Sequence, residues 1–306
     1  MQILWSVILS FCAMLTTVAA AAHSPSDMQV SSGKLEVYQQ FESAYVQART
    51  VRVWLPNGYS NQQKYDVLYM HDGQMLFDAK TTWNKQEWQI DEVASELIQT
   101  QKTRPFIVVG IDNGGELRHS EYFPQKAINY IVTNDNNKHH PLFKETLKAD
   151  HYLKFMVQEL KPFIDKHYSV HSDKEHTFIL GSSMGGLISM YAISEYPEIF
   201  GGAACISTHW PGIDPDTTLP VAQAFYTYMQ GHLPSPTSHK LYFDHGTKTL
   251  DKYYPPLQAQ ADKVIKVKGY TDKNWLTLQF DGADHSEKSW AARLDQPLLF
   301  LLGNRN

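Results

Sequence analysis

A serine between glycines is the residue whose surroundings most clearly indicate covalent chemistry. Ser183 stands at the centre of the motif GSSMG (residues 181–185), which matches the pattern G-x-S-x-G. A strand-like apolar run, Thr177–Leu180, precedes the motif, and a predicted amphipathic helix, Leu187–Tyr196, follows it. A strand, a sharp turn and a helix form the context in which such a serine is exposed as a nucleophile. The alternative is a Gly- and Ser-rich turn that carries no chemistry.

A serine hydroxyl is a poor nucleophile and needs a general base within hydrogen-bond reach. Where the G-x-S-x-G turn is catalytic, the partners follow along the chain in the order serine, acid, histidine. His285 lies in the loop DGADHS (residues 281–286), after the last predicted strand. We therefore predict His285 as the base, with an ordinary surface-loop histidine as the alternative.

Two aspartates after the preceding predicted strand, Lys240–Phe243, are candidates for the acid. Asp251 lies further into the loop and is better placed to reach an imidazole, so we favour it. Asp244 stands at the strand end, where it would support the loop. For both residues the alternative is a capping or solvated carboxylate at the start of the next helix.

Acyl transfer also requires donors for the developing oxyanion. The backbone N–H of Met184, directly after the serine, is one predicted donor. The second is expected in the loop HDGQMLFD (residues 71–78), where Gly73 permits a tight turn and the N–H of Gln74 is our choice. An ordinary strand-to-helix connection is the alternative for this loop.

Strand-like runs alternate with helical patterns along most of the chain. We predict strands over Lys34–Phe41, Thr50–Leu55, Asp66–Met70, Phe106–Ile111, Thr177–Leu180, Gly202–Ile206, Lys240–Phe243 and Trp275–Phe280. We predict helices over Trp88–Gln101, His151–His167, Gly185–Tyr196, Val221–Gln230, Tyr254–Lys266 and Ser289–Leu302. This alternation indicates an α/β fold with a mostly parallel central sheet and helices on both faces. Residues 34–306 are expected to form one domain, with loops at 114–148 and 208–219.

The N-terminal segment is predicted to direct export. Residues 1–22 contain no charged side chain, an apolar stretch through Leu15 and the alanine run Ala19–Ala22, a pattern typical of a cleaved signal peptide. The absence of a lysine or arginine near the start leaves an uncleaved anchor as the alternative. We expect an exported, periplasmic or secreted protein whose mature chain retains one cysteine, Cys205, as a buried thiol.

The charge composition of the chain argues against certain binding partners. Lys and Arg number 27 against 32 Asp and Glu, giving a formal net charge of -5, and no basic run could neutralise phosphates. We therefore expect no nucleic-acid partner, and no membrane partner for the mature chain. No pattern in the sequence predicts the oligomeric state.

Several separate segments resemble the putative esterase family of α/β hydrolases, which includes feruloyl and acetylxylan esterases, siderophore esterases and mycolyltransferases. They are YMHDGQMLFD (69–78), VGIDNG (109–114), ELKPFID (159–165), GSSMGGL (181–187) and FDHGT (243–247). The resemblance implies the α/β-hydrolase fold from about residue 34 onward, with Ser183 as nucleophile, His285 as base and an acid within residues 244–251. Some siderophore esterases of this family are thought to work without the acid, so a Ser-His dyad stays open.

Candidate substrate-binding residues lie in the two loops. Arg118 and Tyr122, with Glu121 between them, resemble a family pattern that lines the site entrance, although an ion pair that pins the loop is equally compatible with them. Trp210 could provide an aromatic wall for an acyl or aryl group, or could pack under its own loop. The loops do not identify the ester.

The sequence predicts a serine esterase that forms an acyl-enzyme on Ser183, with His285 as general base. Its substrate would be a small-molecule or polysaccharide-linked ester. An acyltransferase with an alcohol acceptor and a non-catalytic binding module on the same scaffold are the alternatives. No cofactor is expected, and no catalytic metal is predicted, because no H-E-x-x-H or H-x-x-E-H pattern occurs.

Overall fold

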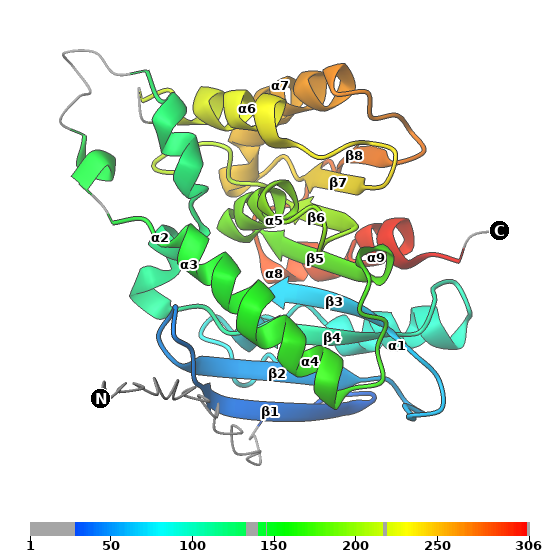
Figure 1. Ribbon diagram of the computed structural model, residues 1–306. Helices are drawn as coiled ribbons and strands as arrows, with labels where there is room; N and C mark the ends of the chain where they lie inside the picture. The colour runs from blue at the N-terminus through cyan, green and yellow to red at the C-terminus, as the bar shows by residue number, and fades with distance from the viewer. Residues whose placement is uncertain (1–27, 133–139, 145, 217–218, 305–306) are drawn as a thin grey trace, which may run out of the picture.

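An eight-stranded sheet forms the centre of the computed structural model (Figure 1), which describes residues 28–132, 140–144, 146–216 and 219–304. The predicted signal peptide, residues 1–22, lies outside the described residues. The strands are β1 (Lys34–Phe41), β2 (Arg49–Leu55), β3 (Asp66–His71), β4 (Phe106–Ile111), β5 (Thr177–Ser182), β6 (Gly202–Ile206), β7 (Lys240–His245) and β8 (Trp275–Gln279). Every predicted strand is present, and no strand end differs from its predicted position by more than two residues.

The strand order, β1-β2-β4-β3-β5-β6-β7-β8, places the site. β1, β2 and β4 are joined by antiparallel pairing, and all the pairs from β4 to β8 are parallel. The carboxyl ends of β3 to β8 therefore meet at one edge of the sheet. The chain passes from β3 to β4 on one side and returns to β5 on the other, and such a switch point is where α/β sheets form ligand crevices.

Helices cover both faces of this sheet. They are α1 (Ile90–Gln99), α2 (Arg118–Tyr122), α3 (Ala149–Lys154), α4 (Lys161–His167), α5 (Met184–Glu195), α6 (Val221–His232), α7 (Tyr254–Val267), α8 (Glu287–Ala291) and α9 (Asp295–Leu302). A π-helical stretch, Phe155–Leu160, joins α3 to α4, so the predicted helix over 151–167 is continuous.

The pleat of the strands divides the core into two layers. In β4, Ile107, Val109 and Ile111 pack with α3 to α7, whereas Phe106 and Val108 pack with α1 and α9. All six residues of β4 are buried. A strand buried on both faces explains why it appears in the sequence as an unbroken apolar run, which is typical of parallel sheets.

Two helix predictions need correction. The helix after Ser183 is buried on nearly every side rather than amphipathic, because it packs between the sheet and neighbouring helices. Its hydroxyl groups are satisfied internally: Ser189 donates to the carbonyl of Gly185. The predicted helix over 289–302 is two helices, since Pro297 cannot donate the backbone bond to residue 293 and so belongs in the first turn of a new helix.

The described part of the segment predicted as a loop over 114–148 contains α2 and the 3-10 turns Gly115–Leu117, Gln125–Tyr130 and Pro141–Lys144. A buried ion pair anchors it: Arg49 Nη1 and Nη2 donate to the two carboxylate oxygens of Glu121 at 2.9 and 2.7 Å. The Arg49 guanidinium also lies over the ring of Tyr152, 5.5 Å from its centroid. The pair therefore ties α2 to β2 and α3.

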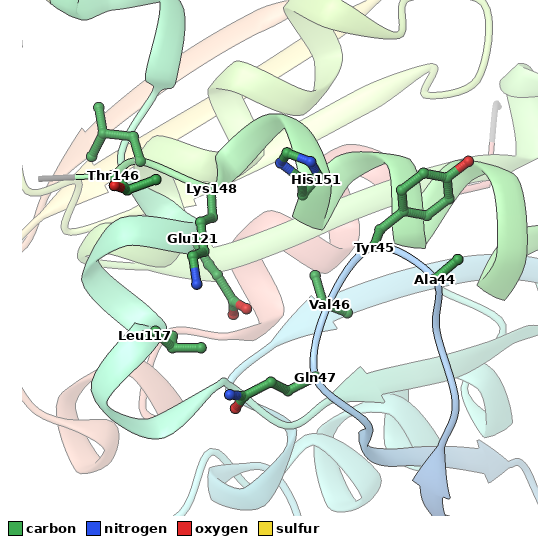
Figure 2. Close-up of a pocket in the computed structure, with 10 residues that line it drawn as sticks. Ala44, Tyr45, Val46, Gln47, Leu117, Glu121, Thr146, Lys148 and His151 are labelled. Carbon is green, nitrogen blue, oxygen red and sulfur yellow. The ribbon is translucent and has the colours of Figure 1, made fainter.

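A pocket of about 410 Å³ lies beside this anchor, between the β1–β2 connection, α2 and α3 (Figure 2). Val46, Leu117 and Leu147 give it apolar walls, and Lys148 and His151 add polar groups. None of the predicted catalytic residues lines this pocket. In the described part of the chain, no helix has both the length and the apolar character needed to span a bilayer.

Replacing Glu121 tests the anchor. We expect Glu121→Gln to lower the free energy of unfolding by about 3–5 kcal/mol, because it leaves the Arg49 charge buried without a counter-ion. Lys34→Gln is the matched control, since Lys34 pairs with Glu36 at the surface, where such pairs contribute roughly 0–1 kcal/mol. Urea denaturation monitored by circular dichroism measures both losses. Equal losses in the two variants would contradict the anchoring role of Glu121.

Candidate active site

Ser183 lies on a strained turn between β5 and α5. Its φ of 58° and ψ of -122° are unfavourable for a residue with a side chain. A Cβ at Gly181 would lie 2.7 Å from the carbonyl carbon of Gly185, so only glycine permits this close approach of strand and helix. Strain of this kind persists where the surrounding structure over-determines it, and it is the geometry that exposes a serine hydroxyl at a helix N-terminus.

The loop after β6 fixes the turn from the other side. The Ser183 N–H donates to the carbonyl of Ile206 at 2.9 Å, and the Ser183 carbonyl accepts from the His209 N–H at 3.1 Å. The Leu187 N–H also donates to this carbonyl, at 3.3 Å. The strained backbone is therefore held by hydrogen bonds from two separate elements.

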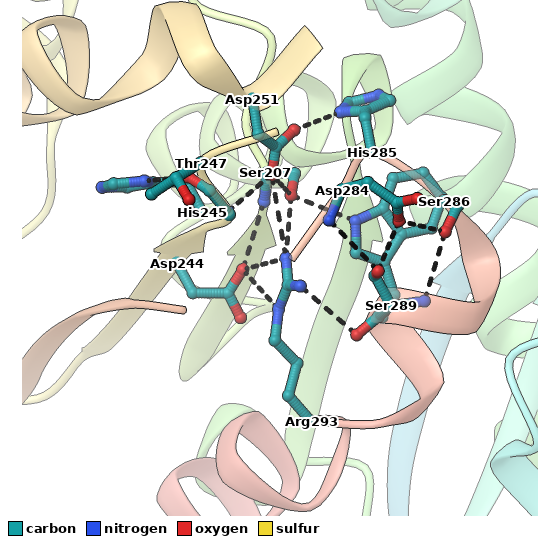
Figure 3. Close-up of polar contacts among 12 residues, drawn as sticks. Ser207, Asp244, His245, Thr247, Asp251, Asp284, His285, Ser286, Ser289 and Arg293 are labelled. Carbon is teal, nitrogen blue, oxygen red and sulfur yellow. Dashed lines mark hydrogen bonds and ion pairs between the residues drawn. The ribbon is translucent and has the colours of Figure 1, made fainter. Parts of the chain in front are cut away.

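Asp251 and His285 meet at the carboxyl edge of the sheet (Figure 3). Asp251 lies in a 3-10 turn, Thr249–Tyr253, after β7, and His285 lies between β8 and α8. Asp251 Oδ1 is 2.6 Å from His285 Nδ1; the Asp251 side chain is fully buried and that of His285 is 14% exposed. The His285 backbone N–H donates to Thr249 Oγ1 at 2.9 Å, which holds the histidine loop against the aspartate turn.

The second oxygen of Asp251 is also fully engaged. Asp251 Oδ2 accepts hydrogen bonds of 2.6 Å from the Ser207 hydroxyl and 2.6 Å from the Gly246 N–H. Burial by itself raises the pKa of Asp251, but the hydrogen bonds from His285, Ser207 and Gly246 outweigh it, and the pKa lies below the usual value. A charged Asp251 accepts a hydrogen bond from the Nδ1–H group and so leaves His285 Nε2 as the basic nitrogen.

Asp244, the other candidate acid, has different partners. Its Oδ1 accepts from Arg293 Nη2 at 3.0 Å and its Oδ2 accepts from the Tyr242 hydroxyl at 2.9 Å. Burial raises the pKa of Asp244, and the nearby Arg293 guanidinium opposes this shift only in part. Asp244 thus supports the strand end, and the preference for Asp251 as the partner of His285 agrees with the geometry.

Three residues of this network carry no signal in the sequence. Ser207, at the positive φ of 43°, accepts hydrogen bonds from Trp290 Nε1 at 3.0 Å and from Arg293 Nη2 at 2.9 Å. The Trp290 ring also meets the His285 ring edge-on at 5.0 Å. Only the position of Ser207 directly after a strand of the parallel sheet could have suggested a role.

Two other buried histidines are poor candidates for the base. Burial lowers the pKa of His71 to about 3 and that of His209 to about 4. Both ring nitrogens of His209 are engaged, Nδ1 with the Tyr254 hydroxyl and Nε2 with the Ile213 carbonyl, each at 2.8 Å. These rings stay neutral and serve as packed hydrogen-bonding groups.

The predicted oxyanion donors come from two neighbouring turns. Met184 begins α5, so its N–H belongs to the first turn, whose N–H groups have no intrahelical acceptor. Gln74 lies in the 3-10 turn Gly73–Met75 directly after β3. A Cβ at Gly185 would lie 3.6 Å from Asp72 Oδ2, which places the two turns against each other.

Of the predicted substrate-binding residues, only Arg118 is partly exposed. Its Nε and Nη2 donate to the two oxygens of Asp72 at 2.7 and 2.8 Å, and 30% of the side chain is accessible. Tyr122 is fully buried against His71 and Tyr152, so the prediction that it lines the entrance is not supported.

For Trp210 the structure shows the second of the two arrangements predicted from the sequence, packing under its own loop. It is fully buried, donates from Nε1 to Gln258 Oε1 at 2.8 Å and stacks on Phe243 at 6.0 Å. The indole packs under its own loop because the loop after β6 folds back onto α7. It therefore forms no aromatic wall at the surface.

Comparisons with known proteins agree with this architecture. The family model described as "Putative esterase" matches residues 43–301. An endo-1,4-beta-xylanase/feruloyl esterase of Xylanibacter ruminicola is 28% identical over 272 residues, 87% of this chain but 31% of that protein.

Solved structures show the same fold. A ferulic acid esterase superposes with a TM-score of 0.64 at 19% identity, covering 88% of this chain and 98% of that one. The enterobactin esterase FES from Shigella flexneri superposes with a TM-score of 0.57 at 19% identity, covering 83% of this chain and 56% of that one. The chain therefore belongs to the putative esterase family, has the α/β-hydrolase fold and is a carboxylic ester hydrolase.

Proposed function

We propose that this chain is a serine esterase that forms an acyl-enzyme on Ser183, with His285 as general base and Asp251 as the acid. The observation that carries the proposal is the 2.6 Å hydrogen bond between buried Asp251 and His285 Nδ1. It lies at the edge of the sheet where Ser183 occupies its strained turn. The proposed nucleophile follows β5, the acid follows β7 and the base follows β8. This is the chain order serine, acid, histidine.

In the proposed first step, His285 Nε2 removes the proton of the Ser183 hydroxyl while the oxygen attacks the ester carbonyl carbon. The charged Asp251 stabilises the imidazolium that forms and keeps Nδ1 protonated. His285 then gives its proton to the leaving alcohol, and the acyl group remains on Ser183. In the second step His285 activates water, which releases the acid and restores the serine.

The oxyanion is proposed to form at the N-terminus of α5. The Met184 N–H is the first donor there, and the helix dipole favours negative charge at this end. The Gln74 N–H is the second donor, because its turn packs against the α5 N-terminus. Neutral His71 and His209 add no charge to this region.

The substrates proposed are esters of aromatic or short acyl groups, either small molecules or groups linked to polysaccharide. The similarity to a feruloyl esterase in sequence and to an enterobactin esterase in fold supports this range. Export through the predicted signal peptide would place the enzyme in the periplasm or outside the cell. Immunoblotting of cell fractions tests the export.

The nucleophile is tested with a matched pair of neighbouring serines. We expect Ser183→Ala to lower kcat on an aryl ester by about 10⁴- to 10⁶-fold and to abolish labelling by a fluorophosphonate probe. Ser182→Ala is the control, because Ser182 is the last residue of β5 and is buried. It should keep labelling and turnover. Labelling of Ser183→Ala at the wild-type rate would refute the assignment.

The acid is tested by comparing the two aspartates. Asp251→Asn should lower kcat by about 10⁴-fold, because an amide at this position no longer stabilises the imidazolium. Asp244→Asn should instead lower the free energy of unfolding by about 3–5 kcal/mol, because it breaks the buried pair with Arg293. Its kcat should stay within tenfold of wild type at a temperature where it is folded. Wild-type turnover in Asp251→Asn would support a Ser-His dyad instead.

A further inference from the structure

A group of metal-ligand side chains lies at the edge of the sheet opposite the catalytic residues. Asp66, His171 and His176 each offer one ligand atom, and these atoms all lie within 4.8 Å of one another. Asp66 is the first residue of β3, whereas the catalytic turns follow the carboxyl ends of β3, β5, β7 and β8. This group is therefore separate from the site described above.

Rigid backbone brings the three residues together. β3 and β5 are parallel with Val67 opposite Thr177, so the preceding residues, Asp66 and His176, are neighbours. His171 is held by its backbone N–H, which donates to the Tyr65 carbonyl at 3.0 Å. Of the three residues, Asp66 belongs to a strand, His176 ends the 3-10 turn directly before β5, and His171 lies in the connection before that turn.

His176 and Asp66 are each oriented by a hydrogen bond to a residue outside the group. His176 Nδ1 is 2.6 Å from Asp173 Oδ1, which leaves Nε2 available on the side of Asp66. Arg104 Nε donates to Asp66 Oδ2 at 2.7 Å, which leaves Oδ1 available. A histidine fixed by a carboxylate through its other nitrogen is the usual arrangement around protein-bound metals.

The donor set of the group is suited to a cation. Asp66, which is nearly fully buried, supplies a carboxylate oxygen, and His171 and His176 supply imidazole nitrogens. Imidazole nitrogens together with a carboxylate oxygen are ligands that divalent transition metals accept.

We propose that Asp66, His171 and His176 bind a divalent first-row transition metal, with zinc as the representative ion. Two imidazoles and one carboxylate suit Zn²⁺, and a water molecule would complete a tetrahedral shell. Asp66 Oδ1 and His176 Nε2 are 4.0 Å apart, and the two imidazole rings are stacked at 4.1 Å. Ligands 2.0–2.1 Å from a tetrahedral ion lie about 3.3 Å apart. Binding therefore requires the ligand atoms, which lie within 4.8 Å of one another, to move closer together and the part-exposed His171 ring to tilt.

The role that follows is structural. The ion would join the segment before β5 to the first residue of β3, at the centre of the parallel sheet. Bound metal would stabilise the folded chain in proportion to the metal concentration, because the unfolded chain lacks the assembled site. Ester hydrolysis should not require this metal, which is compatible with the prediction that no catalytic metal takes part.

Zinc titration of the full mature chain, without a histidine tag and stripped of metal by a chelating resin, tests the proposal. We expect one Zn²⁺ per chain by isothermal titration calorimetry and a higher melting temperature with zinc. His171→Gln and His176→Gln should each weaken binding by about tenfold or more, and Asp173→Asn should also weaken it. Circular dichroism checks that each variant folds.

Two controls separate this site from other histidines. His167→Gln alters an exposed histidine of α4 that bonds to the Phe163 carbonyl, and His285→Gln alters the catalytic base. Both should bind zinc as the wild type does. Absence of zinc binding by the wild type, or equal affinity in the wild type, His171→Gln and His176→Gln, would overturn the proposal. So would loss of binding in His285→Gln.

Discussion

The hydrogen bonds of one hydroxyl group, that of Ser207, organise the buried polar groups of the site. A hydroxyl has one proton and two lone pairs. Trp290 and Arg293 can only donate, so they occupy the lone pairs, and the Ser207 proton is directed to Asp251. Every direction in this network is therefore determined. Hydrogen bonds from His285, Ser207 and Gly246 lower the pKa of Asp251 and so favour its charged form. That charge fixes the tautomer of His285, and the reactivity proposed for the serine depends on the tautomer.

The sequence predicted the sheet, its strands and the residues that follow strand ends, because those features are local. The motif around Ser183 and the order of Asp251 and His285 along the chain pointed to residues that follow β5, β7 and β8, and the structure places Asp251 and His285 within hydrogen-bond distance of each other. Ser207 was missed because its contacts join residues that are 44 to 86 positions apart. No spacing rule in a single sequence reports such partners.

Where the structure departs from the sequence predictions, the reason is burial. The helix after Ser183 was predicted to be amphipathic and Tyr122 to line the site entrance, while for Trp210 both an aromatic wall and packing under its own loop were left open. The helices on both faces and the loop after β6 bury all three instead. The break between α8 and α9 was visible in the sequence as Pro297. It orients Arg293 inward, toward Asp244, which a continuous helix pattern does not reveal.

Trp290 and Arg293 lie after Ser183, Asp251 and His285 along the chain, and they donate both of the hydrogen bonds that Ser207 accepts. Arg293 is also the ion-pair partner of Asp244. A chain cut after His285 would therefore keep Ser183, Asp251 and His285 but leave Asp244 without this counter-ion and Ser207 without these donors. The hydrogen-bond network around Asp251 is thus completed by residues that are synthesised after it.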